Sequence, residues 1–88
     1  MLTHALTIVN PTGIHARPAA LLVNQAKKFT SEITLSKDDK TVSMKSVINI
    51  LGLGLECNDS VTIAANGADE QEAIQSLKEL FLSFAAHD

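Results

Sequence analysis

The chain has 88 residues, of which 45% are hydrophobic and 19% charged, as expected for one folded domain spanning residues 1–88 and not for a disordered protein. Its single cysteine, Cys57, can form no internal disulfide, and no apolar run reaches the roughly 20 residues that span a bilayer, so the sequence predicts a cytoplasmic protein without membrane insertion. A net charge of −3 and only three aromatic residues argue against a nucleic-acid partner.

The first half of the chain predicts a strand, a helix and a hairpin. Residues 4–9 alternate loosely between polar and apolar and end at Asn10-Pro11, which is typical of a strand followed by a turn. From Ala16 apolar residues recur at helical spacing, which predicts a helix over 16–28 with lysines in its last turn. Residues 32–36 and 41–44 alternate around a polar turn, as the two strands of a hairpin do.

The second half adds a short helix, a strand and a long helix. Ser46 before residues 47–51 and glycines after them favour a short helix, and residues 60–64 alternate as a strand. Asp69 and Glu72 resemble a capping box, and an apolar stripe follows at helical spacing.

The element order is therefore β-α-β-β-α-β-α. This order predicts an α+β fold, an open-faced β-sandwich whose four-stranded, mostly antiparallel sheet is covered on one face by three helices. The first helix would let the second strand run parallel to the first, with another strand inserted between them.

Charge is distributed unevenly along the chain. Residues 1–45 hold six of the seven basic side chains against three acidic ones, whereas residues 46–88 hold one basic and seven acidic side chains. The N-terminal half is thus suited to an acidic partner or a phosphate group.

The segment GIHARPAA, residues 13–20, places His15 at the predicted helix start, with the chain's only arginine, Arg17, two residues later. A neutral imidazole can act as a nucleophile, base or ligand near neutral pH, and the unpaired amides of a first helical turn favour a bound anion. The amides of Ala16 and Arg17, with the Arg17 guanidinium, could therefore stabilise a phosphoryl group on His15, while Pro18 holds the entry conformation.

A plainer interpretation is that His15 caps the helix with a ring nitrogen and that Arg17 is a solvated surface charge. Gly13, Pro18, the sole arginine and the local positive charge favour the anion site. No G-x-S-x-G elbow is present, and His4, His15 and His87 lie at no ligand spacing, so the sequence predicts neither a hydrolase nor a metal site, and no cofactor.

Two further positions have alternative interpretations. Ser46 is either a plain N-cap, worth roughly 1 kcal/mol against alanine, or a phosphorylation site whose added charge would repel an acidic partner. The short helix could bury Ile50 and one neighbour, which leaves Val47, Ile48 and Leu51 as an exposed patch beside His15; the alternative is a fully buried helix.

Four segments of the chain resemble the HPr family, the histidine-containing phosphocarrier proteins of the bacterial phosphoenolpyruvate-dependent phosphotransferase system. They are GIHARPAA at 13–20, Lys45-Ser46, the LGL at 53–55 and GADEQEA at 67–73. The similarity extends along the whole chain without an insertion.

The resemblance implies that His15 takes a phosphoryl group at Nδ1 from phosphorylated enzyme I and passes it to the A domains of sugar-specific enzyme II permeases. Such a protein is a monomeric phosphoryl-transfer intermediate whose substrates are protein active sites, and it turns over no small molecule of its own. Arg17 and the first-turn amides would stabilise the phosphoryl group without trapping it.

The resemblance also implies a docking surface and a regulatory site. Ala20 joins Val47, Ile48 and Leu51 on the apolar docking face, and Lys27, Lys40 and Lys45 meet the acidic groups of partners. Ser46 corresponds to the serine that HPr kinase/phosphorylase modifies in many bacteria. The modified form docks poorly on enzyme I and can serve a regulatory protein as a corepressor partner.

Two alternative functions stay open. The chain could belong to the paralogous nitrogen-related branch, whose acceptors are regulatory proteins, or it could be a regulatory binding module that acts through phosphorylated Ser46. The intact His15 and Arg17 argue against the second alternative, because a module used only through Ser46 could lose the histidine.

Overall fold

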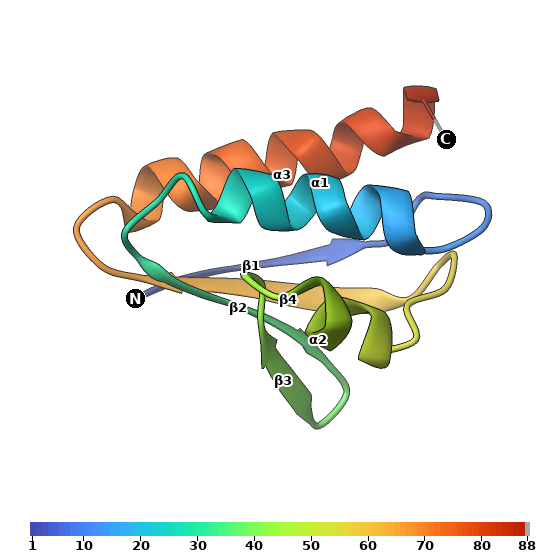
Figure 1. Ribbon diagram of the computed structural model, residues 1–88, viewed down its shortest axis with the longest axis horizontal. Coiled ribbons are helices and arrows are strands. Elements are labelled where there is room, and N and C mark those ends of the chain that lie inside the picture. The colour runs from blue at the N-terminus through green and yellow to red at the C-terminus, as the bar shows by residue number, and fades with distance from the viewer. Residues whose placement is uncertain (88) are drawn as a thin grey trace.

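The computed structural model describes residues 1–87, and the side chains of residues 1–84. Its elements follow the predicted order (Figure 1) and are β1 Leu2–Thr7, α1 Ala16–Ala26, β2 Glu32–Lys37, β3 Lys40–Ser43, α2 Val47–Gly52, β4 Ser60–Asn66 and α3 Glu70–His87. The predicted α+β class with an open antiparallel sheet and three helices is thereby confirmed.

The four strands form one sheet in the order β1-β4-β2-β3. Each neighbouring pair is antiparallel, with Leu6 opposite Val61 in β1 and β4, and Leu35 opposite Ile63 in β2 and β4. Because β4 lies between β1 and β2 and is antiparallel to both, β1 and β2 run parallel to each other. The predicted inserted strand is therefore β4.

The helices pack on one face of this sheet. Figure 1 shows α1 and α3 side by side above the strands, with α2 lower, next to β3. Alternate residues of the central strands face the helices and are buried, as the period of two requires. The helices complete the core with buried apolar side chains, among them Leu22 and Ala26 of α1, Ile50 of α2 and Leu77 of α3. Phe81 and Phe84 meet edge to face near the end of α3, with ring centroids 6.1 Å apart.

Several predicted element ends are wrong, among them those of the first strand and the first helix. The first strand covers residues 2–7 instead of 4–9, because Ile8 bonds to Asn58 and Asp59 outside the strand ladder. The first helix ends at Ala26, so Lys27 and Lys28 follow its last turn and do not lie in it.

The predicted capping box of the last helix is also replaced by another arrangement. The Asp69 carboxylate accepts hydrogen bonds from the Thr30 and Ser31 amides and from the Ser31 hydroxyl, all in the connection between α1 and β2. Glu70, one residue later, is the side chain that reaches back and accepts from the Gly67 amide, at 3.1 Å. Asp69 thus links the segment before α3 to the connection between α1 and β2, and we call these hydrogen bonds the Asp69 tether.

Candidate functional site

His15 lies at the junction between the β1–α1 loop and helix α1. It is the N-cap residue in an extended conformation, its side chain is exposed, and it makes no capping hydrogen bond to the helix. The interpretation that His15 is a plain cap is therefore wrong. The ring is available at the surface, and its position depends on the loop that precedes it.

The backbone before His15 is held against the segment that follows α2. The Ile14 amide donates to the Leu55 carbonyl at 3.1 Å, and the Gly13 amide donates to the Asn10 carbonyl at 3.0 Å. Gly13 has φ +76°, and a Cβ there would overlap with the Leu55 carbonyl oxygen. Only glycine fits this close approach, which explains the residue in the GIHARPAA segment.

The imidazole ring of His15 has one nitrogen engaged within the loop. Its Nε2 lies 3.1 Å from the Thr12 hydroxyl oxygen. A hydroxyl that accepts from Nε2–H stabilises the tautomer whose lone pair is on Nδ1. Because the ring makes no capping hydrogen bond to the helix, Nδ1 is not used as a helix cap. The arrangement therefore suits a nucleophilic Nδ1.

The first turn of α1 offers donors beside this ring. The first intrahelical bond runs from the Ala19 amide to the His15 carbonyl at 3.0 Å, and Pro18 has no N–H, so the amides of Ala16 and Arg17 are the ones left for an anion. The Arg17 guanidinium is exposed, with no hydrogen bond or ion pair to the residues that the structure describes. Both kinds of donor can stabilise negative charge on a group attached to His15.

Ser46 is the N-cap of α2. Its hydroxyl accepts a hydrogen bond from the Asn49 amide at 3.3 Å, so the capping interpretation is realised in the structure. The side chain is half-buried and keeps part of its surface in solvent.

The exposed sides of α1 and α2 carry apolar side chains. On α2, Ile48 is 80% exposed and Leu51 is 39% exposed, whereas Val47 is partly buried and packs against the core. On α1, Ala20 is half-buried, and Leu21, which sequence reasoning missed, is 46% exposed. The two helices contact each other, so these side chains lie on neighbouring elements. Val47 of the predicted patch is thus partly buried, and Leu21 is a further exposed apolar side chain on the neighbouring helix.

The three lysines predicted to meet partners differ in their surroundings. Lys27 is exposed as the C-cap of α1, and Lys40 is exposed at the start of β3 in the hairpin. Lys45 is half-buried, and its Nζ donates to the Phe29 carbonyl at 2.9 Å, which joins the segment after β3 to the end of α1. Lys27 and Lys40 are thus exposed at the surface, whereas Lys45 would have to break its hydrogen bond to Phe29 before it could bind another group.

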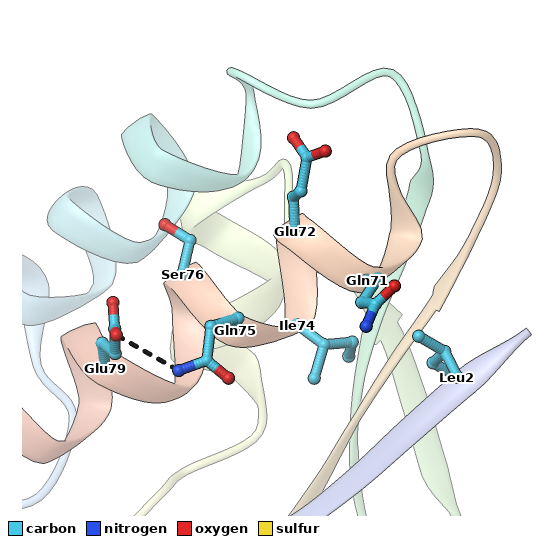
Figure 2. A pocket seen from close by; sticks show the side chains of 7 residues that line it. All are labelled: Leu2, Gln71, Glu72, Ile74, Gln75, Ser76 and Glu79. Carbon is cyan, nitrogen blue, oxygen red and sulfur yellow. Dashed lines mark hydrogen bonds between the residues drawn. The ribbon is translucent and has the colours of Figure 1, made fainter.

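One hollow on the surface is lined by other residues. A depression of about 530 Å³ lies between Leu2 of β1 and the first turns of α3. Figure 2 shows the side chains that line it, among them Ile74, Glu72 and Gln75. None of the predicted site residues lines it.

The described part of the chain holds neither a metal-binding cluster nor a membrane-spanning helix. Among its side chains, which exclude that of His87, no three histidine, cysteine or acidic groups lie close enough to hold a metal ion. No helix within it is long and apolar enough to cross a membrane.

Two features of the site escaped sequence reasoning. Thr12 contacts the His15 ring, although nothing but its distance of three residues along the loop could have indicated this. Lys37, the last residue of β2, forms an ion pair of 2.9 Å with Asp59 on the segment after α2. The hydrogen bond from Lys37, with one from the Glu56 amide, lowers the pKa of the Asp59 carboxyl, and the same pair raises the pKa of Lys37.

Comparisons with known proteins agree with this site. Residues 2–83 match the family described as the PTS HPr component phosphorylation site. The phosphocarrier protein HPr of Mycoplasma genitalium is 47% identical over 72 residues, which cover 81% of this chain and 82% of the relative.

Solved structures show the same fold. The crystal structure of HPr-C-His from Thermoanaerobacter tengcongensis superposes with a TM-score of 0.94 at 43% identity, covering 100% of this chain and 99% of that one. The crystal structure of an HPr dimer from the same organism gives a TM-score of 0.76 at 47% identity, covering 89% and 90% of the two chains. The expectation that the present chain is a monomer therefore stays a prediction.

Proposed function

This chain belongs to the HPr family, the phosphocarrier proteins of the phosphotransferase system, and from that membership we propose that His15 accepts a phosphoryl group from phosphorylated enzyme I and donates it to enzyme II A domains in sugar uptake. The observation that carries the proposal is the His15 ring, exposed at the start of α1 with Nε2 against Thr12 and no capping bond.

The chemistry is a phosphoryl transfer between two protein active sites. The Nδ1 lone pair of His15 attacks phosphorus, an N–P bond forms, and the bond between phosphorus and the donor atom of enzyme I breaks. Positioning and electrostatic stabilisation supply most of the catalysis of such transfers. The Ala16 and Arg17 amides and the Arg17 guanidinium supply donors to the phosphoryl oxygens. Transfer to an A domain reverses these steps with a new acceptor.

Docking is proposed to use the neighbouring surface of α1 and α2. Ile48 and Leu51 offer apolar contact, and Lys27 and Lys40 offer charge to acidic partners. Phosphorylation of Ser46, by an HPr kinase/phosphorylase where one exists, would add negative charge to this surface and weaken docking on enzyme I. We also propose that the chain acts in the cytoplasm and that it is a monomer. Light scattering would check the oligomeric state.

The central test is His15→Ala. With enzyme I and ³²P-labelled phosphoenolpyruvate, we expect the wild type to gain an acid-labile label and His15→Ala to gain none, because the nucleophile is absent. His4→Ala is the matched control, since His4 lies on β1, away from the α1 start, and this variant should be labelled normally. Acid-labile labelling of folded His15→Ala would contradict the assignment.

Arg17 is tested by the pair Arg17→Ala and Arg17→Lys. We expect both proteins to fold, transfer to be slowest in Arg17→Ala, and Arg17→Lys to lie between, since lysine keeps the charge but loses the fork of donors. Stopped-flow transfer from phosphorylated enzyme I measures the rates. Unchanged transfer in Arg17→Ala would remove Arg17 from the mechanism.

The sugar and nitrogen branches are distinguished by the acceptor. The phosphorylated chain is mixed with an A domain from a sugar permease or with one from a nitrogen-related system, and loss of label from the chain is followed over time. We expect the sugar-permease domain to be phosphorylated faster. The reverse order would assign the chain to the nitrogen-related branch.

A further inference from the structure

Residues 54–59, which connect α2 to β4, are held from two sides. On one side is Lys37 at the end of β2, whose Nζ lies 2.9 Å from the Asp59 carboxylate and donates to the Gly54 carbonyl at 3.1 Å. The same Asp59 oxygen accepts from the Glu56 amide at 2.8 Å. One lysine thus contacts both ends of this segment. We call Lys37 and residues 54–59 together the 54–59 clamp.

On its other side the segment holds the loop that carries His15. The Leu55 carbonyl accepts from the Ile14 amide at 3.1 Å, one residue before His15. Gly13 packs so closely on Leu55 that a side chain would not fit there. Ile8 exchanges backbone hydrogen bonds of 2.8 and 2.9 Å with Asp59 and Asn58. The segment is therefore the surface against which the β1–α1 loop is placed.

The backbone of the segment needs such support. Gly54 has φ +63° and Asn58 has φ +75°, so two of its six residues are in the left-handed region, and the Asn58 side chain makes that region less favourable than glycine would. A segment of this shape keeps the Leu55 carbonyl in place only if contacts outside it favour the same conformation. The Lys37 contacts to Asp59 and Gly54 are the side-chain part of this support, beside the backbone bonds to Ile8 and Ile14.

We propose that Lys37 and Asp59 are positioning residues for phosphoryl transfer: by holding segment 54–59 they place the Leu55 carbonyl and, through the Ile14 amide, the backbone of His15. The inference rests on the proposed function of His15 and adds a contribution from residues that do not touch the phosphoryl group. A shift of about 1 Å at a reacting centre costs up to about a hundredfold in rate, so a small movement of the loop is enough to matter.

The transfer rate distinguishes this role from a general contribution to stability. The side chains of Lys37 and Asp59 are 23% and 26% exposed, and ion pairs near the surface contribute little to folding. Loss of the pair should therefore change transfer more than it changes the melting temperature. Docking should be unaffected, because neither residue is among the apolar side chains or the lysines that we propose as partner contacts.

The experiment compares Lys37→Met, Lys37→Arg and Asp59→Asn with the wild type as acceptors of the phosphoryl group from enzyme I. We expect kcat to fall at least about threefold in Lys37→Met and Asp59→Asn with KM unchanged, and to recover in Lys37→Arg, whose guanidinium can bond to the same oxygens. Lys78→Met on α3 is the matched control, since it removes the same charge outside the clamp.

A second measurement follows the conformation of the loop that carries His15 and does not depend on phosphoryl transfer. In ¹⁵N-resolved spectra, Lys37→Met and Asp59→Asn should shift the Ile14 and His15 amides and speed hydrogen exchange at Ile14, and Lys37→Arg and Lys78→Met should not. Wild-type kcat and an unshifted Ile14 amide in Lys37→Met would overturn the inference, and so would a changed KM with normal kcat. If the wild type itself takes no label from enzyme I, the proposed function fails instead, and the amide shifts still test the clamp.

Discussion

The hydroxyl of Thr12 bears on which nitrogen of the His15 ring can react. It lies 3.1 Å from Nε2, and a hydroxyl that accepts from Nε2–H favours the neutral tautomer with its lone pair on Nδ1. Partners of this kind, on the far nitrogen of a functional imidazole, commonly set both ring orientation and tautomer. We therefore expect Thr12 to orient the His15 ring.

The matched pair Thr12→Val and Thr12→Ser tests this role. Valine keeps the shape of threonine without the hydroxyl, so we expect slower phosphorylation by enzyme I and a larger share of the Nδ1–H tautomer, visible in the ¹⁵N shifts of the neutral His15 ring. Thr12→Ser should behave as the wild type. Equal tautomer populations in all three proteins would show that the hydroxyl does not orient the ring.

At the scale of elements, the short helix α2 depends on its cap. It spans Val47–Gly52, and the Ser46 hydroxyl satisfies the Asn49 amide. A helix this short is unstable on its own in water, so it relies on the cap and on burial of Ile50. Ser46→Ala should lower the free energy of unfolding by about 1 kcal/mol in urea titration. Ser60→Ala, an exposed serine on β4, is the control and should change little.

Two further variants at Ser46 separate the effect of helix capping from the effect of added negative charge. Asparagine and aspartate cap helices about as well as serine, so Ser46→Asn and Ser46→Asp should both keep the stability of the wild type. Only Ser46→Asp adds negative charge to the docking surface, and we expect a raised KM with enzyme I in that variant alone. Equal KM values for the two variants would count against regulation through Ser46.

At the scale of the whole molecule, Asp69 joins loops that lie almost forty residues apart in sequence. Its carboxylate accepts from the Ser31 hydroxyl and, at 2.9 Å, from each of the Thr30 and Ser31 amides. These bonds, that of the Ser31 hydroxyl foremost, lower the pKa of Asp69 from 3.8 to about 2. Because the folded-state pKa is the lower one, the carboxylate stabilises the fold above the ordinary value and loses this contribution as pH falls toward 2.

The expected result is a free energy of unfolding that declines with acidification from pH 5 to pH 2, less steeply in Asp69→Asn than in the wild type, as measured by urea titrations across that range. The pKa values of Asp59 and Glu70 are also lowered, so some dependence should remain in the variant. Ser31→Ala should weaken the effect partway. Identical pH profiles for Asp69→Asn and the wild type would show that the tether has no role in acid stability.

Much of the architecture could be predicted because it depends on local patterns. Alternation over residues 32–36 and 60–64 and the helical stripe ending at Phe84 each report which side of an element faces the core, and all three elements formed as predicted. Element ends were less predictable, since Ile8 and Asp69 are held by partners from distant segments. The capping box failed for this reason: Thr30 and Ser31 took the carboxylate that a local pattern assigned to its own helix.

The sequence by itself determined the chemistry of the site: a histidine, an arginine and a proline at a helix start, after a glycine, in a pattern that identifies a family. Only the tertiary structure decided what holds that site in place. Three contacts do so: the Thr12 hydroxyl on the His15 ring, the Leu55 carbonyl on the Ile14 amide, and the Lys37–Asp59 pair that holds the segment of Leu55. The spacing of these residues along the chain does not predict that they meet. The physical reason is that nucleophiles and donors are properties of residue types, whereas their placement comes from which loops the sheet and helices bring together.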